Sequence, residues 1–155
     1  MRYLNKIVFI NSAAIRYSEV QLDGNIHLIG TQGVGKSTIL RAILFFYNAD
    51  TQRLGIPVEK KSYQDYYFPY ADSSIIYEVA REDGWFTVLS YKTMNRICYR
   101  FIASPYRPDL FIDEEGAPYP SDRIRSVLDK NGIKYSGAIS TYEEYRNILY
   151  GNSDN

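Results

Sequence analysis

The sequence predicts an α/β domain in which helices pack on a mixed β-sheet that continues into an antiparallel meander. Three observations predict it. A compact apolar strand at 26–29 runs directly into a glycine-rich segment, and apolar residues recur at helical spacing over 37–47. Three runs rich in β-branched and aromatic residues lie further along the chain, at 74–80, 85–91 and 96–103. Helices that alternate with strands are typical of the α/β class.

The first strands are read from their composition and from a turn signal. Residues 4–11 are rich in Ile, Val and Phe, and 20–22 predict a second, short strand. Asp23-Gly24-Asn25 follows as a turn, so a hairpin with the strand at 26–29 is expected. Residues 48–72 are polar and interrupted by Gly and Pro, which predicts a long irregular segment.

The second half of the chain is predicted to be a meander followed by two helices. Glu82-Asp83-Gly84 joins the first two strands of the meander. One helix is expected from Ser121, after Pro120, to near Gly132. Another is expected after Thr141, since Glu144 three residues later completes the pattern of a capping box.

The composition is that of a folded single domain. The 155 residues are 45% hydrophobic and 23% charged, and 18 basic residues balance 18 acidic ones. Overall charge therefore gives no indication of nucleic acid as a partner. The single cysteine, Cys98, excludes an internal disulfide, and no apolar stretch approaches the roughly 18 residues that span a bilayer. These features predict a cytoplasmic location.

The glycine-rich segment is the motif that indicates chemistry. Gly30-Thr31-Gln32-Gly33-Val34-Gly35-Lys36-Ser37 matches the full G-x-x-x-x-G-K-[ST] pattern of a phosphate-binding P-loop, between a strand and a helix. Glycines let the backbone N–H groups approach phosphate oxygens, and the lysine adds a positive charge. We expect ATP with Mg²⁺ to bind, Ser37 being the magnesium ligand. The predicted nucleotide-binding residues are Gly30, Gln32, Gly33, Val34, Gly35, Lys36, Ser37 and Thr38.

Hydrolysis needs a further carboxylate, and the sequence offers one candidate. Leu110-Phe111-Ile112 precedes Asp113 and Glu114 as a short apolar run, so Asp113 is a candidate magnesium or catalytic residue. The alternative is a hairpin turn, because Glu115-Gly116-Ala117-Pro118 follows directly. His27, the only histidine, is interpreted as a packed or edge residue of its strand.

Sixteen tyrosines are unusual for this length, and four of them lie within 63–70. We interpret Tyr63, Tyr66, Tyr67 and Tyr70 as residues that pack a loop onto the sheet; the alternative is a stacking or partner-binding surface.

The strand, P-loop and helix resemble the start of the ATPase head of structural-maintenance-of-chromosomes (SMC) proteins and their relatives. The likeness rests on Ile26-His27-Leu28-Ile29-Gly30 followed by Gly33-Val34-Gly35-Lys36-Ser37-Thr38-Ile39-Leu40-Arg41-Ala42-Ile43. It implies a P-loop NTPase fold, specifically an ABC-ATPase-like N-terminal lobe, over residues 1–150. It also implies a role in DNA maintenance or defence, with DNA as a possible partner. Residues 151–155 are predicted from their own composition to be a flexible tail.

In that family two chain ends form one head, and this chain resembles only the first. A Leu-Ser-Gly-Gly signature loop, a convincing Walker B strand and a switch histidine are absent from the sequence. The resemblance therefore implies a partner, either a second head or the C-terminal half of the same head, and hydrolysis only in the complete assembly. Gln64 is the nearest candidate for the family's magnesium-contacting glutamine, although it lies in the tyrosine-rich segment. Arg53 resembles an arginine that some heads place near nucleotide or DNA; the alternative, which we favour, is a solvated charge in a loop.

Two other functions fit the same motif. One is a self-contained small P-loop kinase or NTPase, although the arginines Arg123, Arg125 and Arg146 are too scattered for a kinase lid. The other is a binding module that holds nucleotide without turnover.

Overall fold

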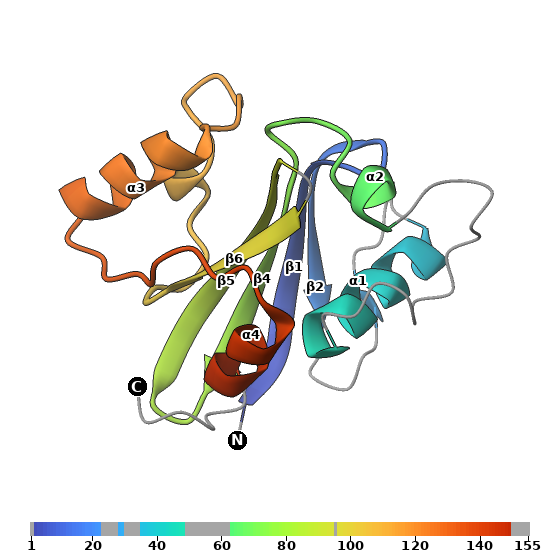
Figure 1. Ribbon diagram of the computed structural model, residues 1–155, viewed down its shortest axis with the longest axis horizontal. Helices are drawn as coiled ribbons and strands as arrows, with labels where there is room; N and C mark the ends of the chain where they lie inside the picture. The colour runs from blue at the N-terminus through green and yellow to red at the C-terminus, as the bar shows by residue number, and fades with distance from the viewer. Residues whose placement is uncertain (1, 23–27, 30–34, 49–62, 95, 150–155) are drawn as a thin grey trace.

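The computed structural model describes residues 2–22, 28–29, 35–48, 63–94 and 96–149. Their strands form one sheet of six strands in the order β3-β2-β1-β4-β5-β6 (Figure 1). The strands are β1 (Arg2–Ser12), β2 (Ile15–Leu22), β3 (Leu28–Ile29), β4 (Ser74–Arg81), β5 (Gly84–Thr93) and β6 (Arg96–Ile102). The helices are α1 (Lys36–Asn48), α2 (Tyr63–Tyr67), the 3-10 helix η2 (Pro108–Leu110), α3 (Ser121–Lys130) and α4 (Tyr142–Leu149).

Most predicted elements are confirmed, with shifted ends. The meander β4-β5-β6, helix α1 and helices α3 and α4 lie where the sequence predicts them. The Thr141 hydroxyl accepts a hydrogen bond from the Glu144 backbone N–H at 3.3 Å, as expected of the cap of α4. Strand β2 begins at Ile15, five residues before the predicted start, and α2 forms within a segment expected to be irregular.

Strand β2 starts early because it follows a tight turn whose residues are not typical turn formers. Ser12 pairs with Ile15, so Ala13 and Ala14 form a two-residue hairpin loop. Both alanines have positive φ, 49° and 65°, as this tight turn requires. Asn or Gly usually occupies such positions, because a β-carbon is strained there. Two alanines therefore gave no turn signal.

The predicted mixed sheet and α/β P-loop fold are wrong for the residues that the structure describes. Every strand pair in this part of the chain is antiparallel, including β2 with β3. Short turns join β1 to β2, β4 to β5 and β5 to β6, and such connections can only produce antiparallel neighbours. The single connection that contains α1 leads from β3 to β4, but β4 pairs with β1 and not with β3. The strand before the glycine-rich segment thus lies at the edge of an antiparallel sheet.

The sheet has a hydrophobic core on each face. Along β1, Ile7 and Phe9 belong to a cluster with residues of α1, α2 and α4, whereas Val8 and Ile10 face a second cluster. That second cluster contains residues of η2 and α3. Figure 1 shows this arrangement, with α1 and α4 on one side of the strands and α3 on the other. Because both faces are buried, consecutive residues of β1 and β4 are apolar, as in Ile7-Val8-Phe9-Ile10 and Ile75-Ile76.

The outer edge of β6 is covered by the chain between α3 and α4. The Ser136 N–H donates to the Phe101 carbonyl at 2.8 Å, and Tyr99 and Ile139 exchange hydrogen bonds of 2.8 Å in both directions. This segment satisfies backbone groups that would otherwise be unpaired at a sheet edge.

Candidate nucleotide-binding site

The predicted phosphate-binding loop connects β3 to α1. Of its residues the structure describes Gly35, Lys36, Ser37 and Thr38, while Gly30, Gln32, Gly33 and Val34 lie outside the described residues. The same is true of His27, Arg53 and the predicted tail at 151–155. A strand before the motif and a helix after it are both present, as the sequence predicts.

The first turn of α1 presents the lysine and the serine to solvent. The Ile39 N–H donates to the Gly35 carbonyl at 3.2 Å, so Gly35 stands at the start of the helix. Lys36 and Ser37 are exposed, and Thr38 is half-buried. No acidic residue lies in this turn. The partial positive charge of a helix N-terminus therefore adds to the charge of Lys36.

The tyrosine-rich segment packs against this turn. The Tyr67 hydroxyl donates to the Thr38 carbonyl at 2.8 Å, and the hydroxyls of Tyr66 and Thr38 lie 3.3 Å apart. Tyr67 and Phe68 are fully buried, whereas Tyr70 is 62% exposed. Burial raises the pKa of Tyr67, which keeps its hydroxyl protonated and able to donate. The interpretation of these residues as packing residues is confirmed for Tyr66 and Tyr67 and is wrong for Tyr70, and the side chain of Tyr63 lies outside the described part of the chain.

Helix α1 is fixed along its length by tyrosines from three other elements. Tyr67 bonds the Thr38 carbonyl, Tyr77 of β4 the Ala42 carbonyl at 3.0 Å, and Tyr145 of α4 the Phe46 carbonyl. These carbonyls are four residues apart and so lie on one side of the helix. The sequence showed an excess of tyrosine but not this use, because the partners of Tyr77 and Tyr145 are distant in the chain.

Gln64, the candidate magnesium-contacting glutamine, lies on α2. Its side chain is half-buried, and its carbonyl accepts a hydrogen bond from Phe68 N–H at 2.9 Å. Since α2 contacts Thr38 through Tyr66 and Tyr67, the structure brings the helix of Gln64 to the start of α1.

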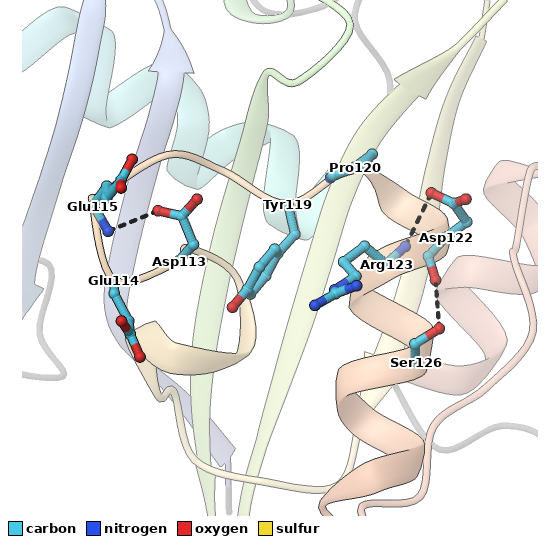
Figure 2. A pocket seen from close by; sticks show the side chains of 8 residues that line it. All are labelled: Asp113, Glu114, Glu115, Tyr119, Pro120, Asp122, Arg123 and Ser126. Carbon is cyan, nitrogen blue, oxygen red and sulfur yellow. Dashed lines mark hydrogen bonds between the residues drawn. The ribbon is translucent and has the colours of Figure 1, made fainter.

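Asp113 lies on the other face of the sheet, in a hairpin turn. Figure 2 shows its carboxylate turned back onto the loop, where Oδ1 accepts hydrogen bonds from the N–H groups of Glu115 and Ala117, both at 2.9 Å. The Asp113 N–H donates to the Ala117 carbonyl at 2.8 Å, and Ile112 pairs with Pro118. The preceding Phe111 packs in the cluster of α3. The hairpin alternative thus describes this segment, and the sheet separates Asp113 from α1.

Asp113 lines a wide, acidic depression of about 830 Å³ beside the start of α3 (Figure 2). Among the lining residues Arg123 carries a positive charge, and its guanidinium lies 5.8 Å from the centre of the Tyr119 ring. The other lining residues are Glu114, Glu115, Pro120, Asp122 and Ser126. Among the described residues no three His, Cys, Asp or Glu side chains are grouped to hold a metal ion. Four carboxylates around one depression disfavour a phosphate ligand there.

The arginines considered for a kinase lid are not brought together. Arg123 and Arg125 belong to α3 and Arg146 to α4, and these helices cover opposite faces of the sheet.

Comparison with known proteins gives a family but no activity. The model of a family described as a protein of unknown function, DUF3584, matches residues 11–153. The chain belongs to the DUF3584 family. No curated protein and no solved structure matches the chain. Of the helices described, none is both long and apolar enough to cross a membrane.

The described geometry of this DUF3584 domain offers an exposed cation, an exposed hydroxyl and a helix N-terminus at one place. This combination suits an anion with several oxygens, and the hydroxyl suits a hydrated magnesium ion.

Proposed function

We propose that the chain binds a nucleoside triphosphate, ATP with Mg²⁺, through residues 30–38. The observation that carries the proposal is the complete eight-residue motif, whose last residues, Lys36 and Ser37, are exposed at the start of a 13-residue helix. In this role Lys36 contacts the terminal phosphates, Ser37 ligates Mg²⁺ and the backbone N–H groups of the loop donate hydrogen bonds to phosphate oxygens.

Charge supports this end of the molecule as the phosphate site. Helix α1 contains two basic residues, Lys36 and Arg41, and no acidic one. The depression around Asp113, in contrast, is lined mostly by acidic side chains. A triphosphate is therefore attracted to the first turn of α1 and repelled from the second location.

We further propose that the chain is one part of an SMC-like ATPase assembly and that hydrolysis requires the other part. Two observations support this. The described residues place Asp113 across the sheet from α1, so it supplies no second carboxylate there. Helix α1 also exposes Leu40, Leu44 and Tyr47, at 45%, 46% and 36%, which recur every three or four residues along one side. An apolar stripe beside a nucleotide site suits contact with another polypeptide.

The experiment is calorimetric titration of the chain and of a Lys36→Ala variant with MgATP, together with a steady-state assay of ATP hydrolysis. Loss of a charge-assisted contact to phosphate is expected to weaken binding by at least about tenfold. The control is Lys130→Ala, which removes an exposed lysine at the end of α3 and should leave affinity unchanged. Far-ultraviolet circular dichroism verifies that both variants are folded.

The outcomes separate the parts of the proposal. Equal ATP affinity of the parent and Lys36→Ala refutes the assignment of the loop. Binding without turnover supports a requirement for a partner. Turnover by this chain alone, abolished in Asp113→Asn, refutes that requirement and identifies a self-contained NTPase or kinase.

A further inference from the structure

A second hollow lies on the sheet face that carries α1 and α4, over β5 and β6. Its volume is about 440 Å³, within the range of pockets that hold small organic molecules. The residues used below are Arg81, Phe86, Phe101, Lys134, Ser136 and Ile148, and Ile102, Ala103 and Tyr135 complete the lining. We refer to it as the Phe86 hollow. None of these residues belongs to the nucleotide-binding motif.

Two phenylalanine rings form the floor of the Phe86 hollow. Phe86 pairs with Val79 and Phe101 with Val88 across neighbouring strands, so both rings project to the same face. Their centres lie 6.1 Å apart at a tilt of 36°. The exposed fractions of Val79 and Val88 are 1% and 0%, whereas both phenylalanines remain partly exposed.

The exposure of these rings has a structural cause. Tyr145 of α4 packs on Tyr99, with ring centres 4.3 Å apart, and its ring centre lies 5.9 Å from that of Phe101. Helix α4 ends at Leu149, and Ile148 forms the wall of the hollow. Among the described residues, α4 thus packs on Phe101 through Tyr145 and leaves Phe86 and Phe101 partly exposed.

Two cations flank the aromatic floor. The Arg81 guanidinium carbon lies 5.4 Å from the centre of the Phe86 ring, which holds the side chain at the rim. Its contact with Asp83 is long, 3.9 Å, and both side chains are largely exposed, so that ion pair is weak. Lys134 is exposed on the segment that covers the edge of β6. The described lining contains no acidic side chain.

The remaining polar groups of the lining are already used within the protein. The Ser136 hydroxyl accepts from the Phe101 N–H at 3.0 Å and donates to the Gly137 carbonyl at 2.8 Å. The Lys134 carbonyl accepts from the Ala103 N–H at 2.9 Å. The Tyr135 hydroxyl donates to Asp129 Oδ1 at 2.8 Å, and the Arg100 guanidinium lies 5.4 Å from the centre of the Tyr135 ring. Among the described lining residues, Phe86, Phe101 and the two cations are therefore the groups available for recognition.

From this arrangement we propose that the Phe86 hollow binds a small aromatic carboxylate. The ligand ring stacks on Phe86 and Phe101, and its carboxylate lies between Arg81 and Lys134. The planar guanidinium of Arg81 suits two carboxylate oxygens, while Lys134 contributes a point charge. The volume accommodates a molecule of one or two rings.

The test uses 3-phenylpropionate as the probe and 3-phenylpropan-1-ol as its uncharged match, titrated against ¹⁵N-labelled protein by NMR. The carboxylate is expected to cause saturable shifts of the amides of Phe86, Phe101 and Lys134, with an affinity at least about fivefold above that of the alcohol. Arg81→Ala and Lys134→Ala should each remove most of that difference and leave binding of the alcohol unchanged. Because both side chains are exposed, these variants are expected to fold; Lys130→Ala serves as the charge-matched control.

Equal affinity for the acid and the alcohol, shifts located elsewhere, or no saturation would each overturn the proposal. MgATP should not compete with the probe, since the nucleotide motif lies at the start of α1. Failure of ATP binding therefore leaves the result for this hollow interpretable, and the reverse also holds.

Discussion

Replacement of Gly132 by alanine should destabilise the protein through the backbone alone. Gly132 follows the end of α3 with a φ of +69°. Its N–H donates to the Asp129 carbonyl at 3.1 Å, and the Ile133 N–H donates to the Leu128 carbonyl at 3.0 Å. Ile133 packs against the cluster that contains Leu128. These contacts form a Schellman motif, in which the left-handed position is usually glycine.

The magnitude follows from two opposing contributions. A β-carbon at Gly132 would meet no atom within 4 Å, so steric overlap with neighbours adds nothing. The left-handed conformation costs an alanine about 1–2 kcal/mol. Lower entropy of the unfolded chain returns about 0.4–1 kcal/mol. The free energy of unfolding should therefore fall by about 1 kcal/mol, which for a domain of this size lowers Tm by about 2–4 °C.

Gly137 provides a matched control for this measurement. A β-carbon there also meets no atom within 4 Å, but its φ lies outside the left-handed region. Gly137→Ala should accordingly raise the free energy of unfolding by about 0.4–1 kcal/mol. Urea denaturation followed by circular dichroism measures both variants. A change of the same sign in the two variants, or no loss in Gly132→Ala, would refute the reasoning.

Three further predictions concern the sheet and α1. Ala14→Gly should stabilise the protein by up to about 1 kcal/mol in urea denaturation, because Ala14 is exposed and strained at a φ of 65°; Ala71→Gly, at an exposed position without positive φ, should destabilise it. Tyr67→Phe removes the hydrogen bond to the Thr38 carbonyl and should cost about 1 kcal/mol, an effect that unchanged stability would contradict. Burial raises the pKa of Tyr106 to about 12 from 10.0. The unfolded chain releases this proton at lower pH than the folded protein does. The contribution of Tyr106 to the free energy of unfolding should therefore be fully present below pH 10 and be lost between pH 10 and about 12. Tyr106→Phe should flatten this fall in the free energy of unfolding, and an unchanged pH profile would exclude the contribution.

Local features of the sequence determined most elements. The helical spacing of Ile39, Leu40, Ile43, Leu44 and Tyr47 predicted α1. Thr141 with Glu144 predicted the start of α4, and Glu82-Asp83-Gly84 predicted the first turn of the meander. These signals succeed because capping, turn geometry and the side-chain period act over a few neighbouring residues.

The predicted parallel component of the sheet failed for the opposite reason. A strand, a glycine-rich loop and a helix are compatible with more than one neighbour for the strand, and strand pairing is not encoded in that local order. The outcome depended on Ala13-Ala14, whose unusual tight turn places β2 between β1 and β3. That pairing makes β3 an antiparallel edge strand.

The motif at 30–37 is readable from the sequence alone, because eight adjacent residues match the pattern of a phosphate-binding loop. The residues that surround α1, the helix that follows the motif, could be identified only from the folded structure. Tyr67, Tyr77 and Tyr145 converge on the carbonyl groups of α1, and Asp113 lies beyond the sheet in its own turn. Such placements arise from packing between residues up to 99 positions apart, which no local pattern specifies.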